Sequence, residues 1–139
     1  MESSISAQDL ASVLEPLRAQ AETRIKQELF GPLNLGKKFL YDSIMPLHVN
    51  ITADSQECCL EFLQGGNIEL HHASLPSPDV TVKGDFETLR NVLVERSSSA
   101  FEEAERNGKI SVAGRTWKGQ QAMEKVRELL GSNPQQTPQ

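Results

Sequence analysis

The chain of 139 residues lacks several features that common protein classes need. Acidic side chains outnumber basic ones by 19 to 14, so the net charge of −5 disfavours nucleic acid as a partner. Aromatic residues are only 5% of the chain, and no basic strip carries aromatics on which single strands could stack. No segment approaches the roughly 18 apolar residues that cross a bilayer, so no stable membrane insertion is expected. The polar, acidic start lacks the order of a signal peptide, which predicts a cytoplasmic protein.

Catalytic motifs are also missing. No serine lies in a Gly-x-Ser-x-Gly turn, and the pair Gly65-Gly66 is not followed by the helix that a phosphate-binding glycine loop requires. The acidic run Glu102, Glu103 and Glu105 is more typical of a solvated helix face than of an acid–base or metal cluster. No nucleophile has a base beside it. The sequence therefore predicts neither an enzyme nor a bound cofactor.

Cysteine and histidine are scarce and poorly spaced for metal binding. The only cysteines, Cys58 and Cys59, are adjacent, and neighbouring strand residues point to opposite faces. A shared metal or an unstrained disulfide is therefore disfavoured, and two structural thiols with Cys58 inward are expected. His71 and His72 diverge in the same way, and His48 lies on the polar side of its strand. Solvent-facing histidines, and no metal site, are the prediction.

The first part of the chain carries an amphipathic stripe. It is interrupted by Pro16, so either two short helices meet there or one helix passes through the proline. The stripe is suited to docking on a sheet, to pairing with a second subunit, or to lying on a lipid surface. Its polar face mixes acidic and basic residues, which favours docking on the sheet. The residues of the stripe are Leu10, Val13, Leu14, Leu17, Ala21, Ile25 and Leu29.

Three strands of alternating polarity follow a connection at residues 33–42. They are predicted at 44–52, 57–64 and 68–72, and the glycines at 65 and 66 mark a hairpin between the last two. Pro46 lies near the start of the first strand, which indicates an edge strand or a late entry into the ladder.

Residues 79–114 predict a strand, two helices and a strand, and are the centre of the expected fold. Asp85 is placed to cap the first of these helices, and Thr116 to cap a closing helix at 115–130. The fold class that follows is α+β, a five-stranded, mainly antiparallel sheet covered on one face by helices. Residues 1–131 are predicted to form a single domain, and the polar, proline-containing residues 132–139 a disordered tail. The apolar undersides of the helices either fill a closed core or leave a ligand pocket.

Several motifs in this central stretch resemble the sterol-carrier-protein type 2 domain, a lipid-binding α+β module. Residues 78–82 (PDVTV), with the helix start at 86–89 (FETL), are similar to the family's Asp-x-Thr strand and its leucine-bearing helix. Residues 99–101 (SAF) are similar to its small-residue and phenylalanine segment. Residues 108–114 (GKISVAG) are similar to its strand bounded by glycines. The resemblance covers about residues 10–130.

The resemblance implies an apolar tunnel between sheet and helices that holds a fatty acyl chain, a sterol-like molecule or another apolar ligand. It implies binding, and transfer of the ligand, without catalysis. The alternative is a closed-core interaction module with no small-molecule ligand, for instance a homodimer through the N-terminal stripe or a sheet edge. The residues that the resemblance places along the tunnel are Phe86, Leu89, Leu93, Phe101, Ile110, Val112, Met123 and Val126.

Overall fold

A computed structural model describes residues 9–29, 35–95 and 98–131, without the side chains of 35, 37, 95, 98 and 125–131. The predicted disordered tail at 132–139 lies outside this description. In no described part of the chain is a helix long and apolar enough to span a membrane. The elements run α2 (Leu10–Leu29), α3 (Leu35–Ser43), β1 (Leu47–Ala53), β2 (Gln56–Phe62), the 3-10 turn η1 (Gln64–Gly66), β3 (Ile68–His71), β4 (Val80–Gly84), α4 (Phe86–Glu95), α5 (Ser98–Arg106), β5 (Ile110–Gly114) and α6 (Trp117–Gly131).

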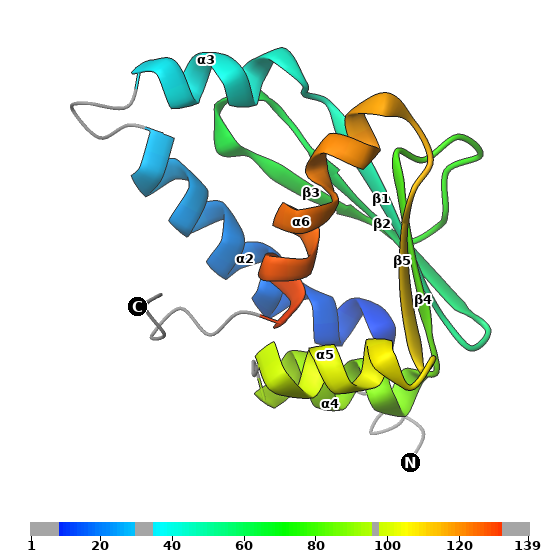
Figure 1. The fold of residues 1–139 in the computed structure, drawn as a ribbon. Coiled ribbons are helices and arrows are strands. Elements are labelled where there is room, and N and C mark those ends of the chain that lie inside the picture. The colour runs from blue at the N-terminus through cyan, green and yellow to red at the C-terminus, as the bar shows by residue number, and fades with distance from the viewer. Residues whose placement is uncertain (1–8, 30–34, 96–97, 132–139) are drawn as a thin grey trace.

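The five strands form one sheet in the order β3-β2-β1-β4-β5. Its neighbouring pairs are antiparallel except for β1 and β4, which run parallel. Helices α2, α4, α5 and α6 gather on one side of the sheet (Figure 1). The predicted class, an α+β fold with a mainly antiparallel sheet under helices, is confirmed.

Strand alternation sorts the side chains between the two faces of the sheet. Leu47, Val49 and Ile51 turn toward the helices and are at most 3% exposed, while His48 and Asn50 turn the other way. The antiparallel register pairs the three inward residues with Phe62, Leu60 and Cys58 of β2. The apolar side of the sheet is therefore continuous from strand to strand.

The loop at residues 72–78 covers part of the outer face. The side-chain amide of Asn50 donates to the carbonyl of Leu75 at 2.8 Å, and the N–H of Leu75 donates back to Asn50 Oδ1 at 3.1 Å. This loop buries Asn50 and its cross-strand neighbour Cys59, while Cys58 is buried on the inner face. The prediction that Cys58 lies inward is confirmed, and both thiols are free.

The N-terminal stripe packs inside the chain. Helix α2 continues through Pro16, and Asp9 caps it by accepting a hydrogen bond from the N–H of Ser12 at 2.9 Å. Leu10, Leu14 and Leu17 are at most 2% exposed. Docking on the sheet, the favoured interpretation of the stripe, is therefore confirmed.

Between residues 33 and 46 one local prediction was wrong, and one of the two interpretations of Pro46 is confirmed. Helix α3 occupies most of the expected connection, and its Phe39 and Leu40 are 75% and 67% exposed. Leu35 and Phe39 do recur at helical spacing, but in the sequence Gly36 and the two lysines after it indicate a connection. The edge-strand interpretation of Pro46 also fails, because β1 is central. The strand enters the ladder at Leu47, just after the proline, as the second interpretation required.

Candidate functional site

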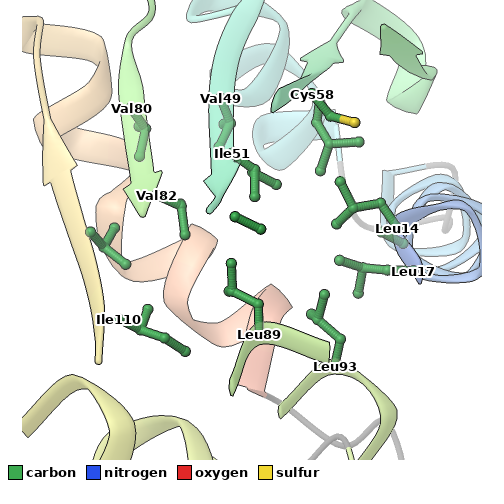
Figure 2. Packing of buried hydrophobic residues seen from close by; sticks show 14 of the residues in the cluster. Leu14, Leu17, Val49, Ile51, Cys58, Val80, Val82, Leu89, Leu93 and Ile110 are labelled. Carbon is green, nitrogen blue, oxygen red and sulfur yellow. The ribbon is translucent and has the colours of Figure 1, made fainter. Parts of the chain in front are cut away.

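The inner face of the sheet and four helices, α2, α4, α5 and α6, contribute to one apolar cluster. Figure 2 shows Val49, Ile51, Val80, Val82 and Ile110 of the sheet facing side chains from the helices. Helix α2 contributes Leu14 and Leu17, and α4 contributes Leu89 and Leu93 (Figure 2). The sheet residues in this set are at most 1% exposed. Apolar side chains from the sheet and the helices pack together here, so this region is the candidate location of a binding site between the two layers.

Most of the predicted lining residues belong to this region. Leu89, Leu93, Phe101, Ile110 and Val112 are buried in the common cluster, at 9% exposure or less. Phe86 and Met123 are partly buried and pack against it. Val126 lies in α6, but its side chain is outside the described part.

The sequence prediction of the site did not include the buried residues of helix α2. Leu10, Leu14 and Leu17 of α2 belong to the same cluster as Leu89 and Leu93 of α4. The signal was present, because the stripe in α2 predicted burial against the sheet. Its position beside α4 depends on how two helices lie on one sheet, which helical periodicity does not encode.

Helix α4, which carries two of the lining leucines, is held at its first turn. Asp85 accepts a hydrogen bond from the N–H of Thr88 at 3.0 Å, and Asp54 from the β1–β2 turn accepts one from the N–H of Phe86 at 3.0 Å. The bond from Thr88 is the main cause that lowers the pKa of Asp85 below its ordinary value. Gly84 allows close contact below this turn, since an added Cβ would lie 2.9 Å from the carbonyl oxygen of Lys109. The predicted cap at Asp85 is confirmed.

Helix α6 is held by Asp79, at the entrance to β4. The Asp79 carboxylate accepts hydrogen bonds from the N–H of His48 at 2.9 Å and from the hydroxyl of Thr116 at 2.7 Å. The Thr116 hydroxyl in turn accepts from the N–H of Gly119 at 3.0 Å, which confirms the predicted cap. The N–H of Arg115 donates to the carbonyl of Asp79 at 2.6 Å. One buried aspartate thus joins β1, β4 and the start of α6.

Buried polar groups are few in the part of the chain that the structure describes. Asn50 and Asp79 are the buried polar or charged residues there, and their hydrogen bonds go to the loop at 72–78 and to the start of α6. Within the same described residues, Tyr41 Oη is the buried side-chain polar atom without a hydrogen-bond partner. Burial is the main cause that raises the pKa of Tyr41 to about 12. The described apolar region itself is suited to an uncharged, apolar group, because a charge there would be costly.

A groove of about 410 Å³ lies elsewhere, between α2 and the edge strand β3. It is open and mostly polar, and is therefore not the predicted apolar tunnel. Its lining residues are Glu15, Arg18, Ile68, Glu69, Leu70, His71 and His72.

Known structures resemble this fold. A ubiquinone synthesis protein, UbiJ-SCP2, matches 84% of this chain and 96% of its own at a TM-score of 0.50 and 16% identity. Sterol Carrier Protein 2 Like 2 from Aedes aegypti matches over 86% and 98% of the two chains, with 18% identity and a TM-score of 0.48. A stereoselective sec-alkylsulfatase from Pseudomonas sp. matches 67% of this chain but 14% of its own, at 19% identity and a TM-score of 0.44.

No family model and no curated protein matches the sequence. At these identities, the likeness to UbiJ-SCP2 is one of fold. The chain has the α+β fold of sterol-carrier-protein type 2 domains, and the resemblance predicted from residues 78–114 is confirmed at that level.

Proposed function

We propose that this protein is a non-catalytic carrier that binds an apolar ligand between its sheet and its helices. A fatty acyl chain or a sterol-like molecule is the class of ligand that such a site takes. The observation that supports this proposal most is the single apolar cluster that joins the sheet to α2, α4, α5 and α6. The sterol-carrier-like fold adds support to the proposal.

Ligand length provides a first test of the proposal. Each buried methylene contributes about 0.8 kcal/mol, which corresponds to about fourfold in affinity. Affinity for a series of fatty acids should therefore rise about fourfold per methylene until the site is full, and then level off. Displacement of a fluorescent fatty acid measures the series. Absence of any displacement, together with no lipid retained in native mass spectrometry, would contradict the proposal.

Two neighbouring positions on α4 offer a matched pair of variants. Leu93 is 6% exposed inside the cluster, whereas the next residue, Val94, is 68% exposed to solvent. Leu93→Arg places a charge in the apolar region and should abolish ligand binding. Val94→Arg places the same charge in solvent and should leave binding unchanged. Equal effects of the two variants would contradict a site at this position.

A larger apolar residue at position 93 separates a ligand site from a closed core. In a filled core, Leu93→Phe overpacks the interior and costs about 1–3 kcal/mol of stability. In a ligand site, the added ring takes space from the ligand, so affinity falls while stability changes little. Chemical unfolding and fatty-acid displacement on the same variant therefore distinguish the two interpretations.

The alternative, a dimerisation module, depends on an exposed surface. The N-terminal stripe does not provide one, since Leu10, Leu14 and Leu17 are buried in the chain's own core. The sheet edges at β3 and β5 are left to this alternative, and part of the β3 edge is occupied. Glu22 accepts from the N–H of Ile68 at 2.9 Å, and Arg18 donates to its carbonyl at 3.0 Å. Light scattering over a range of protein concentrations tests for a dimer. A mass that stays at that of the monomer would exclude the dimerisation module.

A further inference from the structure

The outer face of the sheet brings together three metal-ligating side chains that are separate in sequence. Glu61 of β2 and Glu69 of β3 lie directly opposite each other in the antiparallel register. His71 lies two residues beyond Glu69 and therefore points to the same face. All three stand on paired strands, which hold them more rigidly than loops would.

The ligating atoms are close enough for one ion. His71 Nε2 lies 2.8 Å from Glu61 Oε1 and 3.7 Å from Glu69 Oε1. One ligating atom from each of the three residues falls within 4.8 Å of the others. A dication bound at about 2.0–2.2 Å from nitrogen and oxygen ligands sets those ligands about 3.0–3.6 Å apart. Small side-chain rotations reach that geometry.

Charge gives an independent reason for a cation at this place. Like charges directly opposite each other on neighbouring strands destabilise a sheet, and Glu61 and Glu69 form such a pair. A dication between the two carboxylates would turn this repulsion into attraction.

Glu61 is also supported from its other side. Its Oε2 lies 3.2 Å from Nε2 of His48 on β1, and the backbone N–H of His48 is bound by the Asp79 carboxylate. Partners of this kind orient a ligating group and raise metal affinity. The side chain of Glu61 is 22% exposed, while His71 and Glu69 are 42% and 60% exposed, so an ion has direct access from solvent.

We propose that Glu61, Glu69 and His71 form a binding site for a transition-metal dication such as Zn²⁺. An imidazole nitrogen with two carboxylates suits Zn²⁺, Co²⁺, Ni²⁺ or Cu²⁺ better than Mg²⁺ or Ca²⁺, which prefer oxygen ligands alone. Three protein ligands leave room for water in the remaining coordination positions. The site is on the face opposite the apolar cluster and is independent of the proposed carrier function.

The neighbouring histidine provides the control for a titration with Zn²⁺ by calorimetry. His72 is exposed and is not one of the three proposed ligands. The wild type should bind one Zn²⁺ per chain, and His71→Ala and Glu69→Gln should each weaken binding at least tenfold. His72→Ala should stay within twofold of the wild type, and millimolar Mg²⁺ should not compete. The absorption spectrum of bound Co²⁺ reports the same site by a second signal.

Several results would overturn the metal site. One is the absence of stoichiometric binding by the wild type. Another is equal affinity of the wild type, His71→Ala and Glu69→Gln, and a third is loss of binding in His72→Ala. Circular dichroism on each variant shows whether its fold is retained, and Glu69→Gln provides an exposed, nearly isosteric change if His71→Ala does not fold. Fatty-acid displacement should be the same in all four proteins, so failure here and failure of the carrier proposal are distinguishable.

Discussion

Gly119 in the first turn of α6 is a position where helix propensity and tertiary structure predict opposite outcomes. By propensity alone, Gly119→Ala should stabilise the helix by about 0.8–1.0 kcal/mol. In the fold, however, an added Cβ would overlap the carbonyl oxygen of Asp79 and lie 2.6 Å from its carbonyl carbon. Carbon contacts are optimal at about 3.5–4.0 Å, so the first turn of α6 would have to move by about 1 Å or more.

That displacement breaks the contacts that hold α6. The bonds from the Thr116 hydroxyl and the Arg115 N–H to Asp79 are 2.7 Å and 2.6 Å long, so neither can absorb the shift. The first goes to a carboxylate and contributes about 1.5–3 kcal/mol, and the second about 1 kcal/mol. After the gain in propensity is subtracted, Gly119→Ala should lose about 2–3 kcal/mol of stability. For a domain of this size that lowers Tm by about 8–12 °C.

Urea and thermal unfolding followed by circular dichroism measure this effect, and Gly36→Ala is the matched control. Gly36 lies in α3, and an added Cβ there has nothing within 4 Å. That control should be unchanged or more stable by up to about 1 kcal/mol, since only propensity acts. A Gly119→Ala protein as stable as the wild type would refute the close packing of α6 on Asp79.

Three further predictions concern buried and capping groups. Asn50→Ala removes both hydrogen bonds to Leu75 and should lower the free energy of unfolding by about 2–3 kcal/mol. The same variant should make Cys59, but not Cys58, accessible to thiol reagents. Labelling of both cysteines would contradict this prediction. Burial raises the pKa of Cys59 to about 11, so the native thiol at pH 8 should react about 100-fold more slowly than the unfolded one, and equal rates would refute its burial. The pKa of Asp85 is lowered by folding, so its contribution to stability is present above its ordinary value of 3.8 and lost as pH falls through the lower folded value. In urea unfolding, the wild type should therefore be more stable than Asp85→Asn at pH 7 but not at pH 2. A stability difference that does not change with pH would argue against the charged cap.

The local elements were largely readable from the sequence because burial on one side leaves a period. The alternation at 47–53 gave β1 its apolar face, and the stripe at 10–29 gave α2 its buried side. Helix α3 was expected to be a connection because Gly36 and the two lysines that follow it weighed more than its short apolar pattern. The predicted ends of the strands differ from the observed ends by a few residues, because the alternation of polarity continues past the last hydrogen bond between strands.

The residues proposed for the ligand site came from the resemblance around 78–114. Leu89, Leu93 and Ile110 are buried in the core cluster, and their role in lining a ligand site stays a prediction. The buried leucines of α2 were not included, because the position of α2 next to α4 depends on packing between elements that are far apart in the chain. Tyr41, whose hydroxyl is buried without a partner among the described residues, had no sequence signal at all.

By itself, the sequence determined which residues face a core and which elements they form, because the periods of 2 and 3.6 are local properties. Tertiary structure alone decided which of those elements meet. Gly119 reads in sequence as a weak helix residue, and only its contact with Asp79 makes the glycine necessary. Glu61, Glu69 and His71 read as ordinary strand residues, and only the β2–β3 register places them side by side. Pairing between strands depends on the whole fold, which no local pattern contains.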